Sequence, residues 1–545
     1  MSRPRLWPAA LVLLIGALAI ARIWLVADSI RQWQMVQTIV TSIVVVILLI
    51  AWLAFASRLP RRTRLVGVAL ALGALALVPA VFRIRGVTGD LRPIVEPRLG
   101  RAAALPEPAP PPPAADFPKA AVPAPATSDG VAAVVPAPAA AAAAGSAAPS
   151  RVAAAPVAPD LPAFPQFLGP TRDAMLPGPR LARDWTKHPP RRLWRQPLGP
   201  SWSGFAIAGG IAVTQEQRGA EERVVAYDVA SGRPLWSHAD RARYETVIAG
   251  IGPRATPTID GRQVYAMGAT GILNALDLTS GKRLWSRDVV KEPDAVIPEW
   301  GRSCSPLVVD GRVVVIAGGS RGRRLVAYDA VSGEPVWAAG EGGASYSSAT
   351  LVTLAGRQQL VVLNDASVSG HDPATGAVLW ERPFPREQPN VAIPLLLGPD
   401  RLVVSAGYGV GSKAYRVADE GGVLRATLEW ESPRLKSKFA NLLVHQGFVY
   451  GLDDGVLTCL DPTNGERRWK SGRHGHGQLL LVAGLLLVQT EEGELVLVDP
   501  SPEAYRELTR FSALDGKTWN PPALAGSLLL VRNDREAAAY ELPVE

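Results

Sequence analysis

The sequence predicts an all-β, eight-bladed β-propeller with four-stranded antiparallel blades, preceded by three transmembrane α-helices. Three observations support this prediction: a motif that recurs between residues 163 and 545, a set of inner-strand segments of the same period, and three apolar stretches near the N-terminus. A repeat of roughly 40–50 residues with alternating β patterns is typical of propeller blades, because a single four-stranded sheet cannot bury both of its faces alone.

The motif reads A-Y/L-D-x-x-S/T-G-x-x-x-W, and its clearest copies lie at 226–236, 275–285, 327–337, 370–380 and 459–469. Their aspartates follow one another at intervals of 43 to 52 residues, apart from one interval of 89 residues that contains a weaker copy at 414–430. Two degenerate copies follow at 495–499 and 537–542. In each copy we expect the aspartate to accept backbone N–H bonds of a turn and the glycine to adopt a positive φ. The tryptophan is expected to fill the space between neighbouring blades.

A second signature, a small residue and often a proline followed by hydrophobic residues, precedes each motif copy and predicts the innermost strand of a blade. Eight such segments occur, at 203–210, 255–261, 304–311, 347–356, 392–398, 440–447, 478–484 and 520–526. An outer-strand tryptophan, Trp194, comes before the first of them, and the last motif copy has no outer strand after it. The two chain ends therefore complement each other in one shared blade, which closes the ring.

Three apolar stretches, Pro8 to Ala27, Val36 to Ala56 and Leu65 to Phe82, approach the roughly 20 residues that a helix needs to cross a bilayer. The first also resembles a signal peptide, but no small-residue cleavage site separates it from the second, so a retained anchor is expected. Four arginines crowd the second loop, at positions 58, 61, 62 and 64, and predict that this loop is cytoplasmic. The chain after the third helix then lies on the far side, although arginines at 83, 85 and 92 oppose this orientation.

The net charge of +8 does not indicate nucleic-acid binding, because the excess of positive charge lies in the N-terminal region around the apolar stretches. Residues 1 to 101 contain 13 Arg and only three acidic residues, so the rest of the chain is slightly acidic and offers no basic face. The two cysteines, Cys304 and Cys459, lie far apart and are expected to be buried as small apolar side chains rather than to form a metal cluster or a disulfide framework.

The sequence is divided into a membrane anchor at 1–86, an Ala/Pro-rich linker at 87–162 and the propeller at 163–545. Residues from about 102 to 160 are dominated by Ala, Pro and Val, a composition that cannot build a core. Such a segment favours extended polyproline II and forms a long tether. Two interpretations remain open: the tether lets the propeller reach a distant partner, or it only clears the membrane surface.

These repeats resemble the pyrroloquinoline-quinone-like (PQQ-like) propeller family, and the segment Phe164 to Asp173 (FPQFLGPTRD) is similar to the phrase with which related bacterial propellers open. The resemblance implies the fold, but the family contains both quinoprotein dehydrogenases and non-enzymatic scaffolds, such as the propeller lipoprotein of the outer-membrane β-barrel assembly machinery. It implies that a dehydrogenase needs a calcium site of Glu, Asn and Asp, a catalytic Asp and, in alcohol-oxidising members, adjacent cysteines. The sequence has no adjacent cysteines and no acidic residue at the start of the inner strands.

Residues directly before the inner strands are expected to ring one mouth of the central channel. The candidate ligand-binding residues are Trp202, Arg254, Trp300, Arg302, Tyr346, Asn390, Lys438, Asn441, His474, His476 and Trp519, with Lys436 and Asn520 beside them. Cationic, amide and aromatic groups dominate this set, which suits an anionic or carbonyl-rich ligand or an extended acidic peptide. The alternative is that these residues cap the blades and bind loop backbone. His474 and His476 lack a third ligand nearby in sequence, so no metal site is assigned.

Two functions follow from this reading. The first is a non-catalytic binding or scaffold module, anchored in the inner membrane of a Gram-negative bacterium, with its propeller in the periplasm and a cell-envelope protein or a small anionic ligand as its partner. The second is a membrane-bound quinoprotein alcohol or sugar dehydrogenase. The missing calcium and base residues favour the first, so no cofactor and no catalytic residue are assigned.

Overall fold

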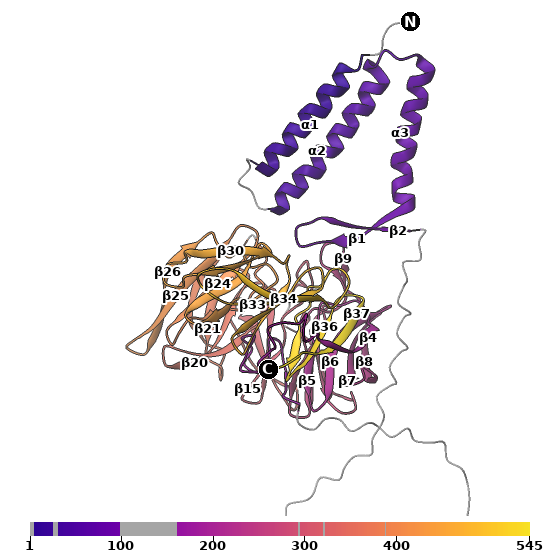
Figure 1. Cartoon of the computed structure of the whole chain (residues 1–545). Helices are drawn as coiled ribbons and strands as arrows, with labels where there is room; N and C mark the ends of the chain where they lie inside the picture. Colours follow the sequence, from indigo (N-terminus) through magenta and orange to yellow (C-terminus); the bar gives the residue numbers. More distant parts are fainter. Residues whose placement is uncertain (1–4, 26–30, 99–160, 293–294, 320–321, 387) are drawn as a thin grey trace, which may run out of the picture.

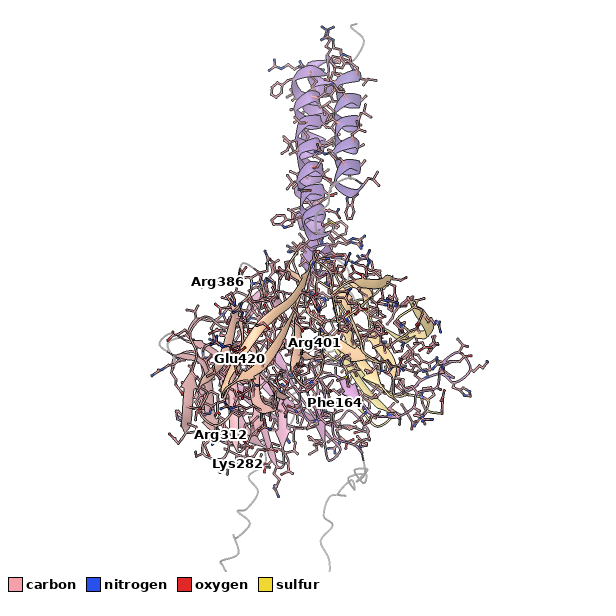
Figure 2. All side chains as sticks on the ribbon, turned by 90° about the vertical axis from the view of Figure 1, so that its left-hand side faces the viewer. Phe164, Lys282, Arg312, Arg386, Arg401 and Glu420 are labelled. Atoms are coloured by element: carbon pink, nitrogen blue, oxygen red, sulfur yellow. The ribbon has the colours of Figure 1, made fainter. Side chains whose placement is uncertain are left out.

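The computed structural model describes residues 5–25, 31–98, 161–292, 295–319, 322–386 and 388–545. Three helices, α1 (Trp7–Leu25), α2 (Arg31–Ala51) and α3 (Arg61–Val81), form a stalk, and α2 continues into a π-helical turn, η1 (Trp52–Ala56). All three are long and apolar enough to cross a membrane, and their apolar side chains are largely exposed, as expected for a lipid-facing surface. Figures 1 and 2 show the stalk rising from one face of a ring of sheets.

A β-hairpin follows α3 without a break. Its strands β1 (Phe82–Val87) and β2 (Pro93–Pro97) pair antiparallel and lie between the stalk and the ring (Figure 1). The hairpin crosses position 86, where the sequence divides anchor from linker. The Ala/Pro-rich residues 99–160, on which the tether hypothesis rests, lie outside the described residues.

The propeller consists of eight blades of four antiparallel strands each, as predicted, and the sheet of blade 7 has a short additional strand that pairs in parallel with its inner strand. From the channel outward, the strands of blades 1 to 4 are β5 (Ala206–Ala208), β6 (Ile211–Arg218), β7 (Glu221–Asp228), β8 (Pro234–Asp240); β11 (Thr258–Asp260), β12 (Gln263–Met267), β13 (Ile272–Asp277), β14 (Arg283–Asp288); β15 (Leu307–Val309), β16 (Arg312–Gly319), β17 (Arg323–Asp329), β18 (Pro335–Ala339); and β19 (Thr350–Leu354), β20 (Arg357–Leu363), β21 (Ser367–His371), β22 (Val378–Pro383).

The strands of blades 5 to 8 are β23 (Leu395–Leu396), β24 (Arg401–Ala406), β25 (Gly411–Glu420), β26 (Val423–Ser432); β27 (Leu443–His445), β28 (Phe448–Asp453), β29 (Val456–Leu460), β30 (Arg467–Arg473); β31 (Gln478–Val482), β32 (Leu485–Gln489), β33 (Glu494–Asp499), β34 (Arg506–Ser512); and β35 (Ala523–Ala525), β36 (Leu528–Arg532), β37 (Glu536–Glu541) with β4 (Arg191–Pro197) outermost. A short ribbon of β9 (Glu245–Thr246) and β10 (Gly250–Ile251) lies in the loop between blades 1 and 2.

Blade 8 closes the ring, because its outer strand comes from the start of the propeller and its other three strands come from the end. Strand β4 pairs antiparallel with β37, with Trp194 opposite Ala539. The Arg195 guanidinium binds the carboxylate of Glu536 across this pair (Nε to Oε2, 2.6 Å), and the Glu536 side chain is only 4% exposed. The closure predicted from the chain ends is therefore confirmed, and it leaves no exposed edge between the first and last blades.

The repeat motif forms the turn that its residue types predict. In blade 2, one carboxylate oxygen of Asp277 accepts the backbone N–H groups of Thr279 (3.1 Å) and Ser280 (2.9 Å), and Gly281 has φ +68°. Burial raises the pKa of Asp277, but its hydrogen bonds from Thr279 and Ser280 outweigh burial and hold this pKa below the ordinary value. Both cysteines are buried, as the sequence predicts.

Candidate functional site

The central channel is crossed by residues Phe164 to Leu176, here called the lead-in segment, which ends in β3 (Met175–Leu176). The segment bridges blade 1 through Phe164 and Ile207, and β3 pairs in parallel with β31, the inner strand of blade 7. The buried guanidinium of Arg172 donates to the carbonyl oxygens of Ser305 (2.5 Å) and Pro306 (3.0 Å) in blade 3. The segment that adds to the family resemblance therefore lies in the channel and connects blades 1, 3 and 7.

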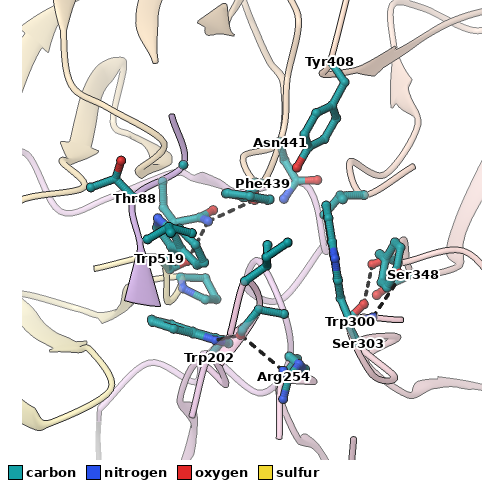
Figure 3. A pocket seen from close by; sticks show the side chains of 18 of the residues that line it. Thr88, Trp202, Arg254, Trp300, Ser303, Ser348, Tyr408, Phe439, Asn441 and Trp519 are labelled. Carbon is teal, nitrogen blue, oxygen red and sulfur yellow. Dashed lines mark hydrogen bonds between the residues drawn. The ribbon is translucent and has the colours of Figure 1, made fainter. Parts of the chain in front are cut away.

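A cavity of about 190 Å³ lies at the channel mouth that faces the stalk. Phe167 of the lead-in segment lines it from inside the channel, and Val87, Thr88, Gly89 and Leu91 of the hairpin line it at the mouth. Six of the predicted residues line it as well: Trp202, Arg254, Trp300, Tyr346, Asn441 and Trp519. Figure 3 shows Trp202, Arg254, Trp300, Asn441 and Trp519 around the cavity.

Seven aromatic residues contribute to the cavity wall. Trp300 stacks on Tyr346 with ring centroids 5.2 Å apart, and Phe439 lies 4.7 Å from Trp519. Trp519 in turn lies 4.9 Å from Trp202. Because each ring is held by the next, the wall is preorganised and presents apolar faces to an occupant.

Two cations adjoin these rings. The Lys517 ammonium lies 4.1 Å from the Trp519 ring centroid and 4.6 Å from that of Trp202, and burial lowers the pKa of Lys517 to about 8. Arg254 lies over Tyr244 (4.6 Å) and donates to the carbonyl oxygens of Ala249 and Gly250. Burial likewise lowers the pKa of Arg254, to about 10. The mouth is therefore aromatic, with a cationic rim.

Two of the predicted residues support the blades instead of lining the cavity. The Arg302 guanidinium is buried and donates to the carbonyl oxygens of Ile316 and Ala317. The side-chain amide of Asn390 donates to the carbonyl oxygen of Asn364 (2.8 Å). For these two residues, the alternative that they hold loop backbone is the better description.

Two of the remaining three predicted residues contact the hairpin. Lys438 donates to the carbonyl oxygen of Gly89 (3.2 Å), and His476 lies 3.1 Å from the Asp90 carboxylate. His474 points elsewhere, toward the Tyr505 hydroxyl (3.4 Å), and burial lowers the pKa of His474 to about 4. The two histidines do not converge.

Sequence reasoning missed several residues of the mouth. Tyr408 and Glu491 lie in the loops after β24 and β32, away from the starts of the inner strands. Phe439 directly precedes the inner-strand segment 440–447 and lines the cavity, but it was not among the candidates. The hairpin was not predicted at all, because a contact such as that of Gly89 with Glu491 joins residues 402 positions apart. The signal available in the sequence was the break in composition between α3 and the Ala/Pro-rich stretch, where Gly89, Asp90 and Pro93 are typical of a turn.

The carboxylates near the mouth are already bound by groups of the protein. Glu491 accepts the Trp519 indole N–H (2.9 Å) and the His476 backbone N–H (3.1 Å), and Asp454 lies 3.7 Å from the Lys438 ammonium. Within the described ranges, no group of three or more His, Cys, Asp or Glu side chains is placed to hold a metal ion. The Glu491 carboxylate is therefore engaged by donors of the chain itself.

Comparison with known proteins gives two groups of relatives. The chain is 30% identical over 178 residues to outer membrane protein assembly factor BamB of Kangiella koreensis (32% of this chain, 40% of that protein) and 26% identical over 279 residues to BamB of Burkholderia pseudomallei (48% and 66%). It is 33% identical over 126 residues to quinohemoprotein alcohol dehydrogenase ADH IIB of Pseudomonas putida (21% and 17%). The chain thus spans less than two thirds of the length of each of these relatives.

The solved structure of quinohemoprotein alcohol dehydrogenase from Comamonas testosteroni superposes with a TM-score of 0.51 at 13% identity, over 70% of this chain and 81% of that chain. At this identity the likeness concerns the fold alone. A family model described as outer membrane protein assembly factor BamB matches residues 185–297 and 294–471, more than half of the chain. This protein is therefore a member of the PQQ-like propeller family that bears the description outer membrane protein assembly factor BamB.

Proposed function

We propose that this chain is a membrane-anchored, non-catalytic binding module whose propeller holds a cell-envelope protein. The observation that carries the proposal is the channel mouth: an aromatic wall with a cationic rim, beside which the Glu491 carboxylate is engaged by protein donors and Asp454 lies 3.7 Å from the Lys438 ammonium. Such a surface suits recognition of another protein, since aromatic and cationic side chains dominate binding hot spots. The names of the BamB relatives, which assign them to outer-membrane protein assembly, agree with this class of function.

The same proposal places the propeller in the periplasm and the stalk in the inner membrane. The arginine-rich loop between α2 and α3 supports this orientation. Of the arginines that oppose it, Arg85 pairs with Asp534 (2.7 Å) and Arg83 with Glu96 (3.4 Å), so their charges are partly compensated on the propeller side. Their weight as cytoplasmic signals is correspondingly reduced.

The runner-up function is a PQQ-dependent alcohol or sugar dehydrogenase. The local identity of 33% to ADH IIB favours it, but that identity covers only 17% of the dehydrogenase. Shared blade repeats explain a sequence match of this length, because the motif residues form turns and contacts between blades and do not bind a cofactor.

Photocross-linking in intact cells tests the binding function and its surface. A photoreactive benzoylphenylalanine is placed at Ile248, which lines the mouth and is 42% exposed, or at Val378, which is 44% exposed on the outermost strand of blade 4. The proposal predicts one discrete, light-dependent adduct with an envelope protein from Ile248 and none from Val378. Adducts from Val378 alone would show that the partner binds at the blade edges. The absence of an adduct from both positions would contradict the proposal.

A further inference from the structure

The turn of the β1–β2 hairpin, Thr88 to Leu91, sits in the channel mouth as a bound ligand would. Two propeller side chains form hydrogen bonds with its main chain. The Gly89 N–H donates to the Glu491 carboxylate (2.6 Å), and the Lys438 ammonium donates to the Gly89 carbonyl oxygen (3.2 Å). The Lys517 ammonium donates to the carbonyl oxygen of Val87 (3.1 Å). Glu491 and Lys438 are both buried, and hydrogen bonds to ionised groups are among the stronger ones.

The mouth also recognises the side chain of the turn. The Asp90 carboxylate lies 3.1 Å from Nε2 of His476 and 3.5 Å from the Arg473 guanidinium, both on the propeller. Val87, which precedes the turn, and Leu91, its last residue, line the aromatic cavity. An acidic residue in a cationic corner and apolar residues against aromatic rings give two independent forms of complementarity.

Shape restricts the turn further. Gly89 is buried, and a Cβ built on it would lie 2.0 Å from Cδ2 and 2.9 Å from Cβ of His476. Because the second of these atoms is fixed to the backbone, any side chain at this position must push the turn away from the mouth. The site thus accepts a glycine followed by an acid.

From these contacts we propose that the channel mouth is a recognition site for an acid-bearing β-turn, that the chain's own hairpin occupies it, and that an envelope protein presenting such a turn displaces the hairpin. The last step rests on the proposed function, whereas the first two do not. The partner's turn and the chain's own turn compete for the same site. Because the hairpin is tethered, it acts at an effective concentration on the order of millimolar. A partner must therefore bind more tightly than the hairpin, or be held close to the site, to displace it.

The test uses the full-length chain in lipid nanodiscs and a fluorescent peptide of residues 82–97, cyclised through its ends because Phe82 and Pro97 are cross-strand partners. Gly89→Ala in the chain expels the internal turn, so this variant is expected to bind the peptide at least about tenfold more tightly than the unmodified chain does. Gly86→Ala is the matched control, since its new Cβ meets only Lys517 Nζ at 3.6 Å and a backbone oxygen at 3.8 Å. It should bind the peptide as weakly as the unmodified chain.

A peptide carrying Asp90→Asn should bind the Gly89→Ala chain roughly tenfold less tightly than the natural peptide. Hydrogen exchange gives a second measure: the Gly89 amide should be protected in the unmodified and Gly86→Ala chains and exchange faster in the Gly89→Ala chain. Equal peptide affinity for all three chains, or protection that Gly89→Ala leaves unchanged, would overturn the proposal. If the peptide binds as expected but Ile248 gives no adduct in cells, the recognition site is supported and the envelope partner is rejected.

Discussion

Trp236, on the outer strand of blade 1, donates its indole N–H to the carbonyl oxygen of Leu278 in blade 2 (2.8 Å). The same bond recurs around the ring, from Trp194 to Val229, from Trp285 to Ala330, from Trp430 to Pro462 and from Trp469 to Ser501. In four of these pairs the acceptor is the residue after the motif aspartate of the next blade. The tryptophan of one repeat is therefore hydrogen-bonded to the turn of the following repeat, and this bond couples adjacent blades.

The motif glycine makes room for this contact. A Cβ on Gly281 would lie 2.4 Å from the Trp236 ring, so Gly281→Ala is expected to combine backbone strain at φ +68° with a clash between blades. We predict a loss of unfolding free energy of about 3 kcal/mol or more, measured by urea unfolding with tryptophan fluorescence. Gly261→Ala is the control, because Gly261 has φ +54° but no atom within 4 Å of its Cβ position, and strain alone should cost about 1–2 kcal/mol. Equal losses for the two variants would show that the interblade contact is not tight.

Ring closure makes a second prediction. Arg195→Ala leaves the buried Glu536 carboxylate without its guanidinium partner and should cost on the order of 2 kcal/mol of unfolding free energy. The control lies on the same strand: Arg191 pairs with Glu541, but both side chains are exposed, and Arg191→Ala should cost less than about 1 kcal/mol. A small, equal effect of both substitutions in urea unfolding would mean that the salt bridge of Arg195 does not hold the closing blade.

Hairpin docking should weaken in acid through Asp90. Burial raises the pKa of Asp90, but the hydrogen bond and charge of His476, together with Lys438 and Arg473, hold this pKa below the ordinary 3.8. A carboxylate with a depressed pKa stabilises the docked state above the undocked pKa and loses that contribution as the pH falls through the docked value. Exchange of the Gly89 amide, corrected for its intrinsic pH dependence, should therefore accelerate below about pH 4 in the unmodified chain.

The Asp90→Asn chain provides the comparison. Its Gly89 amide should already exchange faster at neutral pH, and its corrected rate should lack the acid step. Arg31, 4.0 Å from Asp90, also faces this carboxylate, so Arg31→Gln serves to separate its contribution from that of His476. An acid step that persists in Asp90→Asn would assign the titration to another group.

Much of the propeller was predictable because its determinants are local and repeated. Each motif places an aspartate, a glycine and a tryptophan at fixed spacing, so the number of blades and the shared blade 8 follow from counting copies. The mouth was only partly predictable: a residue before an inner strand, such as Trp300, does face the cavity, but its neighbour Arg302 turns to the blade backbone instead. The turn of the hairpin has a local signal in Gly89, Asp90 and Pro93, but its docking depends on contacts over hundreds of residues, which no local pattern encodes.

The most direct test of the central claim, that this propeller binds and does not catalyse, is a dye-reduction assay. The full-length chain in detergent micelles is incubated with PQQ and Ca²⁺, and reduction of an artificial electron acceptor is followed with alcohols and sugars as substrates. We predict a rate equal to that of the mixture without protein. Quinone-dependent turnover that disappears on Ca²⁺ removal or in a Glu491→Gln variant would contradict the account.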